Sequence, residues 1–124
     1  MHLQLLDDDL WFPEVDKALP DGLLAIGGDL RTQRLLLAYR NGIFPWYDEG
    51  PPMWWCPDPR FVLFPGDLKV SSSMKQLLKK GAFEFTVNKA FKQVIAQCRK
   101  APRKGQDGTW INNDIVQAYT QLHE

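Results

Sequence analysis

Proline and glycine are so frequent in the first half of this chain that no long helix or strand can form there. Eight of the nine prolines lie within residues 1–65, and six of the nine glycines lie within residues 1–66. Proline lacks a backbone N–H and disrupts the interior of a helix, so these residues divide the segment into short pieces. We therefore predict an irregular N-terminal half with one short helix. The segment can still pack, because fixed proline φ angles lower the entropy lost on folding.

The short helix is predicted over residues 31–40, which read RTQRLLLAYR. Asn41 and Gly42 follow this run and give an ordinary C-terminal signal. Asp29 is the best candidate for the N-cap. The apolar spacing predicts a buried face made of Leu35, Leu36, Tyr39 and Ile43.

Beyond Pro65 the pattern predicts strands alternating with helices. A helix should begin at one of Ser71, Ser72 or Ser73, run to Lys80 and stop at the glycine that follows. Residues 83–87 (FEFTV) alternate and predict a strand. A strand is also expected over 61–64, and a strand end at 68–70. A further helix should be capped by Asn88 and bury Phe91, Val94, Ile95 and Cys98. A last helix should start at Asn112 or Asn113 and bury Ile115, Val116, Tyr119 and Leu122.

These patterns predict an α+β fold with two domains. Residues 1–64 form a small Pro/Gly-rich domain, and residues 65–124 form the first part of a second one, with the boundary near residues 63–67. The second region has too few strands to build a covered sheet, and its last helix has no stop signal. We therefore expect a fragment of a longer protein. The alternative is a final helix that simply frays at the chain end.

The net charge of zero conceals a strong asymmetry. Residues 1–62 carry ten acids and five bases, and residues 63–124 carry the reverse. All ten bases of the second half lie between Lys69 and Lys104, where Glu84 is the single acid. Such a stretch predicts a polyanionic partner, and the alternative is a solvated basic face. Lys75, Lys79 and Lys80 share one predicted helix surface and are candidates for phosphate contacts.

Composition excludes several classes of protein. With 44% hydrophobic and 24% charged residues the chain is not disordered as a whole. It has no apolar run long enough to span a bilayer, and its acidic start is not a secretory signal. Two cysteines, Cys56 and Cys98, make no disulfide framework and indicate a reducing, cytoplasmic location.

Catalytic and metal-binding signatures are missing from the sequence. The two histidines stand at the two ends, and no phosphate loop or nucleophile motif occurs. We therefore expect no metal and no cofactor. Cys56 is interpreted as a packing residue, and the Gly27–Gly28 pair as a tight turn before the helix. Asp7, Asp8 and Asp9 are interpreted as capping or solvated residues, and the alternative for these aspartates is weak cation binding.

Aromatic residues are concentrated among the prolines. Residues 42–47 (GIFPWY) and 52–60 (PMWWCPDPR) together hold five aromatic residues, three of which are tryptophans. Aromatic rings on stiff backbone can form a slot that stacks nucleobases. Beside a basic surface, such a slot is typical of proteins that grip the end of a single-stranded nucleic acid. The alternative is that Trp54 and Trp55 form the core of a small domain.

The same residues carry a resemblance to a known family. The chain resembles bacterial leucyl/phenylalanyl-tRNA–protein transferases, over about the N-terminal half of such a protein. The matching strings are residues 22–30 (GLLAIGGDL), 35–46 (LLLAYRNGIFPW) and 54–60 (WWCPDPR), with shorter matches at 73–75, 91–95, 108–111 and 118–124.

The resemblance implies an aminoacyltransferase with a small N-terminal domain and an acetyltransferase-like (GNAT) domain. Such an enzyme moves leucine, phenylalanine or less well methionine from aminoacyl-tRNA to a protein with N-terminal Arg or Lys, which marks that protein for the N-degron pathway. Trp46 and Trp110 match the pair that holds the 3′-terminal adenosine. Lys75, Lys79 and Lys80 match a basic helix that contacts tRNA, although Ser72 and Gln76 stand where bases are expected.

The implied reaction is aminolysis of an ester, in which a neutral α-amine attacks and an oxyanion develops. The family's residues for this chemistry lie in its C-terminal half, so we assign no catalytic residue to this chain and expect it to be inactive alone. Two other hypotheses compete. One is a stand-alone tRNA-binding or single-stranded nucleic-acid-binding module without enzymatic activity, and the other is an inactive structural piece.

Overall fold

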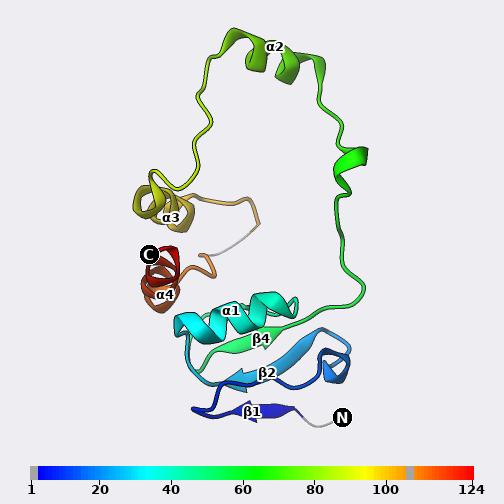
Figure 1. Ribbon diagram of the computed structural model, residues 1–124, viewed down its shortest axis with the longest axis vertical. Coiled ribbons are helices and arrows are strands. Elements are labelled where there is room, and N and C mark those ends of the chain that lie inside the picture. The colour runs from blue at the N-terminus through cyan, green and yellow to red at the C-terminus, as the bar shows by residue number, and fades with distance from the viewer. Residues whose placement is uncertain (1–2, 106–107) are drawn as a thin grey trace. The chain divides into compact units, whose positions relative to one another are not determined.

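The computed structural model describes residues 3–105 and 108–124. The chain forms two compact units, which are described separately. The first unit combines Met1–Asp58 with Ala90–Glu124, and the second unit is Pro59–Lys89. Figure 1 shows the order of the elements along the chain. The described residues form a mixed α/β structure with one four-stranded sheet and four α-helices. The predicted domain boundary between residues 64 and 65 stays a prediction.

The sheet of the first unit corrects the prediction of an irregular N-terminal half. Its strands are β1 (Gln4–Leu6), β2 (Leu23–Gly27), β3 (Phe44–Pro45) and β4 (Met53–Trp55), in the order β1-β2-β4-β3. β1 runs parallel to β2, and the other pairs are antiparallel. The strands are only two to five residues long, which fits the spacing of the glycines and prolines.

Helix α1 (Thr32–Arg40) lies where the sequence predicted a helix, but two details differ. The N-cap is Arg31, not Asp29; the Asp29 carboxylate instead accepts from the Arg31 backbone N–H in a turn before the helix. Leu35 is buried as expected. Of the other residues expected on the buried face, Ile43 is buried, whereas Leu36 and Tyr39 are exposed and Arg34 takes up the buried position on the helix.

Two more helices belong to the first unit: α3 (Phe91–Lys100) and α4 (Asn113–His123). The Asn112 side chain caps α4 by accepting from the Ile115 N–H at 2.9 Å, which confirms the predicted start. On α3 the predicted cap Asn88 is wrong, because the N-cap is Ala90. Ile95 is buried on α3, but Val94 and Cys98, which were expected to be buried, are exposed.

The apolar core of the first unit has two clusters. One surrounds Trp54 of β4 and includes Leu24 of β2 and Leu35 of α1. The other joins Tyr47 to Ile95 of α3 and Ile115 of α4. The stretch 90–124 therefore packs with residues 1–58, from which it is separated in the sequence by the second unit.

The second unit contains α2 (Ser72–Lys80) and the single 3₁₀ turn Pro65–Asp67. Ser71 caps α2 by accepting from the Met74 N–H at 3.2 Å, and Gly81 ends it at φ 63°, which confirms the predicted helix. The strands predicted over 61–64, 68–70 and 83–87 are absent from this unit. These residues have strand composition, but no neighbouring strand pairs with them, and Phe61 and Phe85 are exposed.

Within residues 3–105 and 108–124, no helix combines the length and the apolar character that a bilayer span requires.

Candidate nucleic-acid-binding site

Trp46 and Trp110 line the same pocket in the first unit, which has a volume of about 530 Å³. Trp46 directly follows β3, and Trp110 lies just before α4. Trp46 is 54% exposed, and Trp110 is half-buried. The structure therefore brings together the two tryptophans singled out from the sequence. The other lining residues are Tyr39, Phe44, Pro45 and Arg103.

The backbone around Trp46 is fixed on both sides. The Trp46 N–H donates to the Met53 carbonyl at 3.0 Å, and the Trp46 carbonyl accepts from the Trp55 indole N–H at 2.7 Å. Pro45, immediately before it, is buried and has a restricted φ angle. An exposed indole on backbone held in this way offers a flat surface that loses little entropy when a ring stacks on it.

Trp110 is held by packing on α4. Its ring meets the ring of Tyr119 edge to face, with centroids 5.9 Å apart. Trp110 also packs against the second core cluster, beside Ile111 and Ile115. The side of the pocket that it forms is thus anchored in the core.

A tyrosine pair supports the same pocket. The hydroxyls of Tyr39, which lines the pocket, and Tyr119 are hydrogen-bonded to each other. Burial raises the pKa of Tyr119, and the hydrogen bond with Tyr39 raises it further. An ordinary tyrosine is already protonated at neutral pH, and the raised pKa keeps Tyr119 protonated, and with it this contact between α1 and α4, to more alkaline pH. The sequence placed Tyr119 on the inward face of its helix, but did not indicate this pairing.

Arg103 is the charged residue among those that line the pocket. Its guanidinium donates to the Cys98 carbonyl at 3.2 Å and to the Ala101 carbonyl at 3.5 Å. Both carbonyls belong to the C-terminal end of α3 and the residue after it. Sequence reasoning placed Arg103 in a charged loop, and no signal in the sequence linked that loop to the tryptophans.

The predicted phosphate contacts lie in the second unit. Lys75, Lys79 and Lys80 are all on α2, and all three side chains are exposed. Lys75 and Lys79 are four residues apart and therefore share a helix face. The last turn of α2 also holds two cations, which complement the negative end of the helix dipole.

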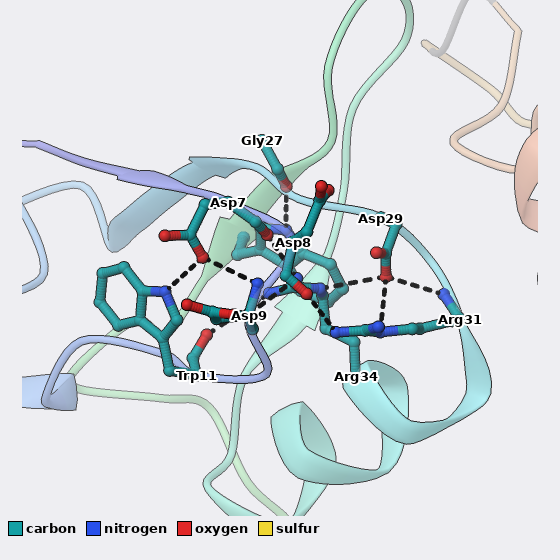
Figure 2. A network of polar contacts seen from close by, with 9 residues as sticks. Asp7, Asp8, Asp9, Trp11, Gly27, Asp29, Arg31 and Arg34 are labelled. Atoms are coloured by element: carbon teal, nitrogen blue, oxygen red, sulfur yellow. Dashed lines mark hydrogen bonds and ion pairs between the residues drawn. The ribbon is translucent and has the colours of Figure 1, made fainter.

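A second polar centre surrounds Arg34, whose side chain is 0% exposed (Figure 2). The guanidinium donates to the Asp29 carboxylate at 3.1 Å and to the carbonyls of Asp7 at 2.7 Å and Asp9 at 3.1 Å. A longer hydrogen bond of 3.4 Å reaches the Trp11 carbonyl. The network ties the segment after β1 to α1 and has a structural role, which the sequence did not reveal.

The aspartate run Asp7–Asp9 is part of this network. The Asp7 carboxylate accepts from the Trp11 indole N–H at 2.9 Å and from the Asp9 N–H at 2.9 Å. The bond from Trp11 holds the pKa of Asp7 below its usual value. The tight turn expected at the Gly27–Gly28 pair is wrong, because Gly27 is the last residue of β2 and pairs with Leu6 of β1, and Gly28 follows it outside any turn. Both glycines have positive φ angles, of 102° and 73°. Among the described residues, no cluster of His, Cys, Asp and Glu could hold a metal ion.

Comparison with known proteins places the chain in a family. Residues 28–58 match the model of the leucyl/phenylalanyl-tRNA protein transferase N-terminal domain, and residues 62–124 match the model of leucyl/phenylalanyl-tRNA protein transferase. The chain belongs to the leucyl/phenylalanyl-tRNA protein transferase family. Trp46 falls in the first matched region, and Trp110 falls in the second.

Curated members of the transferase family align along almost all of this chain. It is 54% identical to the leucyl/phenylalanyl-tRNA–protein transferase of Flavobacterium johnsoniae over 94% of this chain and 55% of the relative. The transferase of Oleidesulfovibrio alaskensis is 51% identical over 100% of this chain and 50% of the relative. The transferase of Thermodesulfovibrio yellowstonii is 50% identical over 100% of this chain and 51% of the relative. The chain thus spans about half the length of the curated relatives it matches.

Proposed function

We propose that this chain forms the part of a leucyl/phenylalanyl-tRNA–protein transferase that holds the 3′ end of the aminoacyl-tRNA. The observation that carries the proposal is the pocket shared by Trp46 and Trp110. The two residues come from regions that are far apart in the sequence and that match two different family models. A pocket of about 530 Å³ with aromatic walls suits a nucleoside, because ligand pockets start at roughly 300 Å³.

In this proposal the terminal adenine stacks on the two indoles. Base–aromatic stacking contributes about 1–3 kcal/mol per base and does not need hydrogen-bond recognition. Trp46 presents an exposed ring on fixed backbone, and Trp110 presents a ring anchored on α4. The adenosine is thereby oriented, and with it the ester that joins the amino acid to the ribose. Such positioning of a reacting group is a main source of enzymatic rate enhancement.

The whole reaction that we propose moves leucine, phenylalanine or methionine from tRNA to the N-terminal Arg or Lys of a protein in the cytoplasm. The product is then a substrate of the N-degron pathway. Aminolysis of the ester also needs a base for the attacking amine and stabilisation of the oxyanion. We assign neither role to the present residues. An acetyltransferase-like (GNAT) architecture for the region that begins near residue 65 is part of the proposal, as is the domain division at residues 64 and 65.

Substitution of the tryptophans tests the proposal. We expect Trp46→Ala and Trp110→Ala each to weaken binding of an aminoacyl-adenosine analogue by about 1–3 kcal/mol, because each removes one stacking surface. Isothermal titration calorimetry measures the loss. Trp11→Ala is the matched control, since Trp11 does not line this pocket and lies in the Arg34 network. Wild-type affinity in both pocket variants would show that the stacking role is wrong.

The lysines of α2 give a separate prediction about tRNA. Each lysine that neutralises a phosphate contributes about 0.7–0.9 to the slope of log K against log salt concentration. Replacing Lys75, Lys79 and Lys80 together by glutamine should therefore lower the slope for tRNA binding by about 2–3. Lys17→Gln, in the acidic half of the chain, serves as the control. An unchanged slope in the triple variant would exclude these lysines as phosphate contacts.

A further inference from the structure

The charge in the tryptophan pocket is not explained by stacking alone. Arg103 lines the pocket beside the two indoles, yet adenine is neutral and needs no cation. The partners of the guanidinium, the Cys98 and Ala101 carbonyls, are also neutral. These two hydrogen bonds therefore leave the positive charge of the guanidinium unneutralised. A cation at the edge of an aromatic pocket therefore points to an anionic group on the ligand.

The Arg103 side chain is hydrogen-bonded to the C-terminal end of α3. The Cys98 carbonyl belongs to the last turn of the helix, where backbone carbonyls lack partners within the helix. By donating to this carbonyl at 3.2 Å, the exposed Arg103 side chain joins the end of α3 to the pocket that it lines. A guanidinium has five N–H donors, so two bonds to carbonyls leave other donors for a ligand. Arginine also has a planar shape that matches two phosphate oxygens.

We propose that Arg103 binds the phosphodiester that joins the terminal nucleoside to the nucleotide before it. This inference rests on the proposed function, because it takes the stacked adenosine as given and adds the next group along the strand. In a nucleic acid, a phosphate lies directly on the 5′ side of each nucleoside. An anion-binding residue at the edge of the adenosine pocket is therefore suited to this group. Arg103 would fix the direction in which the strand leaves the pocket.

The test compares two dinucleotides that differ only in charge. One is cytidylyl-(3′→5′)-adenosine with its natural phosphodiester, and the other carries an uncharged methylphosphonate at the same place. We expect the unaltered protein to bind the phosphodiester about tenfold more tightly at low salt, because hydrogen bonds to charged groups are stronger. In Arg103→Gln this ratio should fall to about one. Lys104→Gln is the matched control, because Lys104 is adjacent but does not line the pocket.

Each outcome separates this inference from the proposed function. If Arg103→Gln keeps the ratio of the unaltered protein while Trp46→Ala weakens both dinucleotides, the arginine has no phosphate role but the stacking pocket stands. If Arg103→Gln weakens both dinucleotides equally, its guanidinium contacts the base and the inference is wrong. If the unaltered protein binds neither dinucleotide, both the inference and the proposed function are wrong.

Discussion

Replacement of Arg34 by methionine is expected to lower the free energy of unfolding by about 1–3 kcal/mol, the usual cost of leaving a hydrogen-bond acceptor unsatisfied. The side chain is 0% exposed and donates to the Asp29 carboxylate and to three carbonyls of residues 7–11. Methionine fills a similar volume but has no donor, so the three carbonyls lose their contact with Arg34, and Asp29 is left with Arg31 alone. Most domains are stable by only 5–15 kcal/mol, so the loss is a large fraction.

Arg31 provides the control for this measurement. Its guanidinium pairs with the same Asp29 carboxylate at 3.4 Å and donates to the Asp8 carbonyl at 2.6 Å, but its side chain is 42% exposed. Water can replace these contacts, so we expect Arg31→Met to cost about 1 kcal/mol or less. Urea unfolding followed by circular dichroism compares the two variants. Equal midpoints for Arg34→Met and Arg31→Met would contradict a structural role for the buried network.

Replacement of Trp54 by alanine should destabilise the first unit by about 3–5 kcal/mol, as for other buried Trp and Phe truncations. Trp54 is 0% exposed and stands on β4, between β2 and β3. Its ring meets Phe12 edge to face at 4.9 Å, and its indole N–H donates to the Gly27 carbonyl at 3.0 Å. Alanine would leave a cavity and an unpaired carbonyl at the centre of the larger core cluster.

Trp55 is the natural comparison for Trp54. The two residues are adjacent on β4, so their side chains point to opposite faces of the sheet. Trp55 is only half-buried, and its indole N–H donates to the Trp46 carbonyl, outside the two core clusters. We expect Trp55→Ala to have a clearly smaller effect on the urea midpoint. A greater loss from Trp55→Ala than from Trp54→Ala would show that the core is misassigned.

Local signals in the sequence were sufficient for the helices. Ser71 and Gly81 delimit α2, and the cap residue Asn112 begins α4, because capping depends on residues a few positions apart. The strands depend on distant partners and were not predictable in the same way. β2 is an apolar run without alternation, so it was not recognised as a strand. Residues 83–87 alternate well but have no strand to pair with.

The candidate site was predictable only in part. Trp46 and Trp110 were paired by family resemblance, because nothing in their spacing shows that they share a pocket. Arg103 lies in a loop, where side-chain direction has no periodic signal. Arg34 belongs to a helix that ends at Arg40 and follows the N-cap Arg31, and arginines spaced in this way predict a solvated face. A buried arginine becomes recognisable only when the carbonyls that surround it are known.

The discontinuous first unit has a consequence for how such chains can diverge. Its two stretches are joined through residues 59–89, where irregular segments lie on both sides of α2, and doubling the length of a flexible segment costs only about 0.6 kcal/mol. Insertions and deletions in the irregular segments before and after α2 can therefore accumulate between species while both indoles keep their places. A length change between β3 and β4 is different, because a one-residue slip in the Phe44–Trp55 register turns every side chain to the opposite face. Selection on indel position should differ accordingly between these two regions.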